Sequence, residues 1–400
     1  MLMSSASGLT FWGMVGTLGP LAAAGSIIGV LPHNLKVLVL LIGPLFVPFG
    51  NFLMGIFTDI IGRKKIFLIT MVIYGAGIVI ISLSYTFLPL ILGLMLAEFG
   101  VGGEEIPSLS LVAEDSPISG RAKWLTIISD FDNIGSALIA GLFVVIVNSF
   151  FDRIVLLIAA SILIVIMVFS RIKLPESFKW EVLHGKLKEG EKTRSELYID
   201  TNGVTVKKSS YKLSFFVLMS IAISQYASFG LMAYVIGPYE FPGAFQDDMI
   251  IFVALIGASA GGFIAAPLIT RGRKKYTLYS YGVGFLSTVL IFALVPYLHD
   301  VIIFYPLLFL NMIMSEFAWA SRTTLEPELV PTARRGTFIG VVRLAPMIVY
   351  PILVYLTSNV SLIVFIAINM GLWLLGFIAA IVWHIYGIET ANVNIDYPEG

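Results

Sequence analysis

Acidic residues stand inside long apolar stretches of this 400-residue chain. A charge at the centre of a membrane helix costs about 3 kcal/mol, so such acids are functional candidates by default. Loss of water and a neighbouring acid both favour the neutral form of a carboxyl group, which can then bind and release a proton near neutral pH. Reversible protonation is the chemistry of proton coupling. The candidates are Glu104, Asp130, Glu98, Asp132 and Glu316.

The arrangement of these acids has two interpretations. Glu98 aligns with Glu316 in the other half of the chain, so the two halves could present acids across a pseudo-twofold axis. The alternative is structural ion pairing, of Arg343 with Glu316 or of Arg322 with Glu326 four residues further along one helix. Two arginines cannot neutralise all of the acids. At least one acid is therefore expected to bind protons or substrate.

Amide, aromatic and arginine side chains in the same stretches are candidates for substrate binding. Aromatic rings and amides suit sugar hydroxyls or an uncharged metabolite. Arginines suit a carboxylate, and the excess of acids also permits an organic cation. For any single aromatic residue, packing or a place at the membrane interface is the alternative. The candidates are Asn51, Gln225, Tyr226, Asn311, Trp319, Arg322 and Arg343, and Tyr234, Asn369 and Trp373 are further candidates.

The composition indicates an integral membrane protein. Hydrophobic residues make up 58% of the chain and charged residues 12%, with a mean hydropathy of +0.94. Cysteine is absent and the four histidines are scattered, so we expect neither a metal site nor a cofactor. The net charge of zero gives no reason to expect a nucleic-acid partner. The first apolar stretch lacks a preceding basic residue and a cleavage pattern, which favours a retained helix over a signal peptide.

Runs of about 20 mainly apolar residues, the length that spans a bilayer, recur along the chain. We predict twelve spans, at 8–30, 37–57, 66–86, 89–113, 123–149, 154–171, 213–237, 248–269, 276–296, 301–325, 336–358 and 361–386. The predicted fold is therefore an all-α integral membrane protein with two six-helix bundles. The predicted domains are an N-terminal bundle at 1–171, a cytoplasmic linker at 172–212, a C-terminal bundle at 213–388 and a cytoplasmic tail at 389–400.

Most of the 25 Lys and Arg residues fall in the connections after the even-numbered spans. Cytoplasmic loops carry such an excess, so both termini and the polar insert are expected in the cytoplasm, with the chain crossing the cell membrane many times.

Charged motifs occur twice, about half the chain apart. Glu-x-x-Pro-x-x-x-Arg stands at 114–121 and 328–335, and Gly-Arg-Lys-Lys stands at 62–65 and 272–275. Pro175-Glu176-Ser177 returns as Ile388-Glu389-Thr390. A repeat of this kind indicates internal duplication, so the two bundles are expected to be pseudo-symmetric.

The stretch from Gly55 to Lys65, between the second and third spans, resembles the signature loop of the major facilitator superfamily. The segment 100–107, the motif at 114–121 and the Pro-Glu-Ser motif resemble its sugar porter and metabolite:proton symporter branch. The resemblance implies two bundles that expose a central site alternately to each side. It also implies that Glu104, after two glycines, couples protons. One departure is Glu98, where the family usually has arginine.

The repeated motifs lie at predicted cytoplasmic helix ends, where the resemblance implies a gate. Ion pairs at a wet rim contribute about 0–1 kcal/mol each, so several together make a reversible latch. The alternative is ordinary positive-inside charge with solvated carboxylates. The gate candidates are Asp59, Gly62, Arg63, Glu114, Arg121, Glu176, Arg273, Glu328, Arg335 and Glu389.

The function expected from these features is secondary active transport by alternating access. Proton-coupled symport of a small polar metabolite, a sugar or an organic acid, is the first hypothesis. A proton-coupled efflux antiporter for cationic or amphipathic compounds is the second, and a non-transporting membrane sensor is the third. No catalytic cluster or ATP-binding motif is evident, so an enzyme is not expected. The expected partners are the substrate, a coupling proton or sodium ion and the lipid bilayer, and the expected state is a monomer.

Overall fold

The computed structural model describes residues 2–115, 120–146, 148–172, 210–241, 243–329 and 335–391, and these residues contain helices but no strand. The first half holds α1 (Leu2–Ala24), α2 (His33–Ile61), α3 (Arg63–Ser82), α4 (Phe87–Asp115), α5 (Arg121–Ser129), α6 (Phe131–Ile146) and α7 (Ser149–Ile172). Most of the predicted linker and tail, at 173–209 and 392–400, lies outside the described residues.

The second half begins with α10 (Tyr211–Gly230), a π-helical turn η2 (Leu231–Val235) and α11 (Ile236–Glu240). The other long helices are α12 (Ala244–Leu268), α13 (Arg273–Ala293), α14 (Val301–Glu328), α15 (Arg335–Leu356) and α16 (Leu362–Tyr386). Short 3₁₀ turns lie between them at η3 (Ile269–Arg271), η4 (Val295–Tyr297) and η6 (Thr357–Asn359).

Eleven segments of the described chain are long and apolar enough to cross a membrane. Among them, α5 and α6 form one span, as do α10, η2 and α11. The remaining predicted span is α1, whose 23 residues include several serines, threonines and glycines that lower its hydropathy. The all-α membrane fold predicted from the sequence is thereby confirmed.

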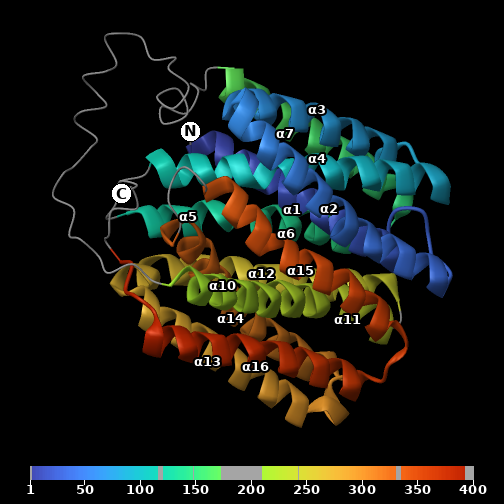
Figure 1. Ribbon diagram of the computed structural model, residues 1–400. Helices are drawn as coiled ribbons and strands as arrows, with labels where there is room; N and C mark the ends of the chain where they lie inside the picture. The colour runs from blue at the N-terminus through green and yellow to red at the C-terminus, as the bar shows by residue number, and fades with distance from the viewer. Residues whose placement is uncertain are drawn as a thin grey trace, which may run out of the picture.

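The helices form two groups that lie against each other. In Figure 1 the helices α1 to α7 occupy one side of the bundle and α10 to α16 the other. The groups meet where α2 packs on α15, and where α5 and α6 pack on α12. The start of α1 and the end of α16 lie at the same end of the bundle (Figure 1).

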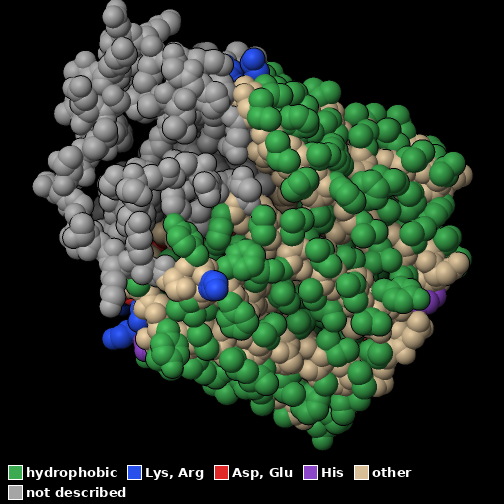
Figure 2. Space-filling model, viewed as in Figure 1, with side chains coloured by type: hydrophobic (Ala, Val, Ile, Leu, Met, Phe, Trp, Pro, Cys, Tyr) green, Lys and Arg blue, Asp and Glu red, His purple; other side chains and the backbone are tan. Residues whose placement is uncertain are grey.

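The outer surface is apolar. Figure 2 shows a face covered mainly by hydrophobic side chains, with few charged ones. Large side chains on several helices point outward, among them Val72, Phe169 and Ile302, which are 67%, 73% and 79% exposed. A continuous apolar surface of this extent would aggregate in water and is suited to contact with lipid.

Glycines set the close approach of α4 to its neighbours. A Cβ atom at Gly102 would lie 2.3 Å from the carbonyl oxygen of Val47 on α2, and one at Gly103 would lie 2.4 Å from the Met54 side chain. Small residues let membrane helices pack this closely. These contacts fix the rotation of α4 and so the directions in which its acids point.

Candidate functional site

Three buried acids of α4, Glu98, Glu104 and Glu105, have three different surroundings. Glu98 enters a cavity between the two halves. Glu104 is fully buried and accepts a hydrogen bond of 2.9 Å from the hydroxyl of Thr70 on α3. Glu105 forms an ion pair with Arg343 on α15, with 2.6 Å between its Oε1 and the arginine Nη1. Adjacent residues of an α-helix differ by about 100°, which is why Glu104 and Glu105 separate so completely.

The cavity at Glu98 is small and lies where the halves meet. Its volume is about 50 Å³, enough for one or two water molecules, whereas a site that holds a whole small molecule measures roughly 300–1,000 Å³. The cavity as it stands is thus too small to hold a whole small molecule. The first half contributes Trp12, Gly16, Gly19, Pro20, Val39, Leu40, Gly43, Pro44, Val47 and Glu98, and the second half contributes Tyr226, Tyr234 and Tyr350.

Glu98 is the acid in this cavity, and it is 1% exposed. Neither of its carboxylate oxygens has a hydrogen-bond partner among the described residues. The rings of Tyr226 and Tyr350 lie edge to face, with centroids 5.5 Å apart and planes at 89°. The indole Nε1 of Trp12 likewise has no acceptor in the described part of the chain.

A buried network of charges lies beside the cavity. Arg343 holds Glu105 from the first half and Glu326 on α14, with a distance of 2.9 Å between its Nη2 and Glu326 Oε2. Glu326 also faces Arg322, one turn earlier on α14, at 3.2 Å. The pairing of Arg322 with Glu326 is the structural ion pair considered from the sequence. The other ion pair considered, Arg343 with Glu316, does not form, because the guanidinium of Arg343 pairs with Glu105 and Glu326.

Arg322 connects this network to the cavity wall. Its Nη1 donates to the side-chain oxygen of Gln225 on α10 at 3.2 Å. Its guanidinium lies 4.1 Å from the ring centroid of Trp319 and 6.0 Å from that of Tyr226. Four substrate candidates from the sequence, Gln225, Tyr226, Trp319 and Arg322, are therefore neighbours, with Tyr226 between the arginine and the cavity.

A second acidic site joins the halves at α6 and α14. The amide nitrogen of Asn133 donates to Asp130 at 3.1 Å and to Glu316 at 2.8 Å. Asp130 and Glu316 are 0% and 2% exposed, and each retains one oxygen without a partner in the described structure. A Cβ atom at Gly262 on α12 would lie 2.3 Å from the carboxyl carbon of Asp130, so only glycine leaves room for this acid.

Of the remaining candidates, Asp132 adjoins the acidic site beside Asn133, and Asn51 and Asn311 lie elsewhere. Asp132 accepts from the backbone N–H of Asn133. Asn51 is buried on α2, and neither atom of its amide has a partner in the described chain. Asn311 donates to Ser287 and Thr288 of α13 and so braces two helices of the second half.

At the end of the bundle where the termini lie, three of the gate candidates come together, since Arg273 contacts both Glu328 and Glu389. Arg273 binds Glu328 through two contacts, Nε to Oε2 at 3.0 Å and Nη2 to Oε1 at 2.8 Å. Glu389 accepts from the backbone N–H of Arg273 at 2.7 Å. The hydroxyl of Thr390 donates to Glu328 at 2.6 Å. Residues from the start of α13, the end of α14 and the segment after α16 are thus tied together.

The backbone conformation explains why glycine begins both copies of the repeated Gly-Arg-Lys-Lys motif, at 62–65 and 272–275. Gly62 and Gly272 have φ values of 108° and 151°, at the starts of α3 and α13. These values favour glycine, because a side chain strains the backbone there. The other gate candidates lie outside the described side chains: Asp59, Arg63, Glu114, Arg121, Glu176 and Arg335.

The opposite end of the bundle has its own contact between the halves. The hydroxyl of Ser26, after α1, donates to Asp248 on α12 at 2.6 Å, and both side chains are buried. This hydrogen bond joins the two halves on the side away from the termini.

Sequence reasoning missed Trp12, Asn133 and Tyr350. The position of Asn133, three residues after Asp130, was a usable signal, because residues three apart share a helix face. Trp12 and Tyr350 gave no local signal, since aromatic residues are common throughout the chain.

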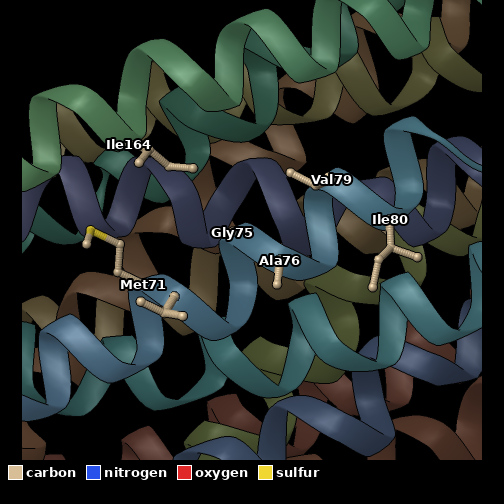
Figure 3. Close-up of a pocket in the computed structure, with 7 residues that line it drawn as sticks. Met71, Gly75, Ala76, Val79, Ile80 and Ile164 are labelled. Carbon is tan, nitrogen blue, oxygen red and sulfur yellow. The ribbon is translucent and has the colours of Figure 1, made fainter.

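A larger groove on the outer surface differs in character. Figure 3 shows Met71, Gly75, Ala76, Val79 and Ile80 of α3 beside Ile164 of α7. The groove measures about 480 Å³ and, with Val72, is lined by apolar side chains alone. It offers nothing to orient a polar molecule and suits a lipid chain. Among the described residues no group of acids and histidines is arranged to hold a metal ion.

Two groups of membrane-length helices that meet at a central cavity with a buried acid are the architecture of a secondary transporter. Residues 1–352 match the Major Facilitator Superfamily, so the chain belongs to this family. Members of the family are transporters, and the chain is accordingly a membrane transporter and not an enzyme.

Two relatives from Bacillus subtilis (strain 168) resemble the chain in sequence. A putative niacin/nicotinamide transporter, NiaP, is 28% identical over 302 residues, which cover 73% of this chain and 70% of that protein. A minor myo-inositol transporter, IolF, is 24% identical over 194 residues, which cover 48% of this chain and 43% of that protein.

Solved structures share the fold. The proton:xylose symporter XylE bound to 6-bromo-6-deoxy-D-glucose has a TM-score of 0.74 at 17% identity, covering 98% of this chain and 96% of that chain. A partially occluded, inward-open XylE from E. coli has a TM-score of 0.68 at 16% identity, covering 97% of each chain.

Proposed function

We propose that this transporter is a proton-coupled symporter of a small polar metabolite, with both termini in the cytoplasm and a monomer as the working unit. The observation that carries the proposal is the Asn133 amide, which bridges Asp130 and Glu316 between the two halves. One amide group faces two buried carboxylates, and two negative charges this close repel each other in a medium of low dielectric constant.

A proton on either carboxyl group removes that repulsion and lets the two halves stay together here. Loss of the proton weakens the same contact and favours separation of α6 from α14. Proton binding thus favours one arrangement of the halves over the other, which is the differential interaction that coupling requires. Glu104, bound by Thr70 within the first half, remains the proton-coupling candidate suggested by family resemblance.

The experiment is transport by purified protein in proteoliposomes with an imposed pH gradient. Nicotinate, nicotinamide, myo-inositol and xylose are the first substrates to test, because the relatives and the fold neighbours are named for them. We expect accumulation that follows the acid-outside gradient and survives replacement of Na⁺ by K⁺. Drug-like cations driven out by the same gradient would favour the efflux antiporter instead.

Variants assign the coupling site. Asp130→Asn and Glu316→Gln are expected to abolish gradient-driven accumulation while substrate exchange at equal pH continues. Glu104→Gln is the matched comparison. If Glu104→Gln loses accumulation and the other two keep it, coupling belongs to α4 and not to the bridge. If all three variants accumulate substrate fully, proton coupling by these acids is refuted.

A further inference from the structure

The carboxylate of Glu98 is buried without a partner. A buried carboxylate that lacks hydrogen bonds or an opposite charge is strongly disfavoured, so native structures nearly always supply one or the other. Here neither oxygen has a donor among the described residues, and the side chain is 1% exposed. The group also faces a cavity between the two halves of the transporter. A bound ligand is a natural source of the missing partner.

The cations nearest to the cavity are already occupied. Arg343 holds Glu105 and Glu326, and Arg322 holds Glu326 and the oxygen of Gln225. These two arginines and two glutamates sum to zero charge, so the network leaves nothing to offset Glu98. When Glu98 is ionised, the cavity therefore carries one negative charge that the described part of the chain does not balance, and a bound cation would stabilise that ionised form.

The other walls of the cavity are aromatic. Trp12 comes from α1, Tyr226 from α10, Tyr234 from η2 and Tyr350 from α15. The face of an aromatic ring attracts a cation, by about 0.5–1 kcal/mol at exposed sites and about 2 kcal/mol or more where water is excluded. Gly230 makes room for one of these rings, because a Cβ atom there would lie 2.4 Å from the Tyr350 side chain.

We propose that this cavity is the substrate subsite for a positively charged nitrogen, so that the transported molecule is a small organic cation such as a primary or methylated amine. The inference rests on the proposed transport function and narrows its substrate class. The present volume of about 50 Å³ fits an ammonium or methylammonium group. Separation of the two halves makes room for the rest of the substrate. The Nε1–H of Trp12, which has no acceptor in the described part of the chain, can donate a hydrogen bond to a polar atom of the substrate.

The same geometry disfavours the other substrate classes. A carboxylate placed here would face Glu98 at close range in a medium of low dielectric constant. A sugar has no charge to pair with Glu98, so its hydroxyls would gain less than a cation from the ionised carboxylate in this mainly aromatic and apolar cavity.

The test compares three probes that share one ring and differ in charge: benzylamine, benzyl alcohol and benzoate. Binding to the purified protein is measured by calorimetry at pH 7, where benzylamine is a cation. We expect benzylamine to bind at least tenfold more tightly than the other two. Glu98→Gln should lose this preference, and Glu98→Asp, which keeps the charge, should retain part of it.

Asp300→Asn is the control for charge removal. Asp300 is exposed at the start of α14, where its side chain caps the helix by accepting from Ile302, and asparagine caps equally well. This variant should bind benzylamine as the wild type does. Tyr350→Phe should also keep the affinity, because the ring remains, while Tyr350→Leu should lower it severalfold.

Any of three results overturns the proposal. The wild type could bind benzylamine and benzyl alcohol with equal affinity, or it could fail to bind benzylamine. Glu98→Gln could also keep the wild-type preference for benzylamine. Such a failure is distinguishable from failure of the transport function. If gradient-driven uptake of myo-inositol or nicotinate continues in proteoliposomes, the symporter stands and only the cationic substrate class is wrong.

Discussion

Removal of Arg343 tests whether the buried network holds the two halves together. Arg343→Met leaves Glu105 and Glu326 buried, at 4% and 1% exposed, without the guanidinium that contacts both. Removing one partner of a buried ion pair costs about 3–5 kcal/mol, because the remaining charge has no compensation. Glu326 keeps Arg322, so the uncompensated charge is mainly that of Glu105. We expect a loss of about 3–5 kcal/mol in the free energy of unfolding.

The assay is reversible unfolding in mixed micelles by titration with sodium dodecyl sulfate, followed by tryptophan fluorescence. Lys275→Met is the control, because Lys275 is exposed and such a change is worth about 0.5 kcal/mol or less. Glu105→Gln combined with Arg343→Met should be less destabilised than the sum of the single variants, by about 1–3 kcal/mol. Two results would refute the ion pair between the halves. One is that the losses in free energy of unfolding of the two single variants add up to that of the double variant. The other is that Arg343→Met loses no more free energy of unfolding than Lys275→Met.

Three further perturbations follow from single contacts. Gly262→Ala places a methyl group against the Asp130 carboxylate and should reduce transport at least tenfold in proteoliposomes, whereas Gly340→Ala, which meets no atom within 4 Å, should transport normally. Glu328→Gln weakens both contacts with Arg273 and should lower the transport rate severalfold without lowering the amount of protein in the membrane, as a quantitative immunoblot would check. Ser26→Ala removes the hydrogen bond to Asp248 and should increase labelling of a cysteine introduced beside the cavity from the outer side; unchanged labelling would contradict a closing role for Ser26.

The helices and the buried acids were predictable because both depend on local sequence. A run of about 20 apolar residues predicts a span wherever it occurs, and a carboxyl group within it is unusual in any fold. The loop glycines Gly62 and Gly272 were also visible as a repeat, and their positive φ values give the physical reason.

The direction of each acid was not predictable, because helix rotation is set by packing. Glu98 and Glu316 align in sequence, yet one lies in the central cavity and the other accepts from Asn133. The rotation of α4 follows from contacts such as that of Gly102 with Val47, more than fifty residues away in the chain. No periodicity in the sequence reports such a contact.

The π-helical turn at Leu231–Val235 determines which residues line the cavity. Tyr226 and Tyr234 are eight residues apart, and in a regular α-helix their side chains would point about 80° away from each other. The wider turn absorbs about one extra residue, which brings them within about 20° of a common face. Both rings therefore line the cavity beside Glu98. Conversion of this turn to α geometry would rotate the following segment by about 100° and carry Tyr234 away from Glu98. A change from π-helical to α-helical hydrogen bonding at Leu231–Val235 would thus remove Tyr234 from the cavity lining without moving Tyr226.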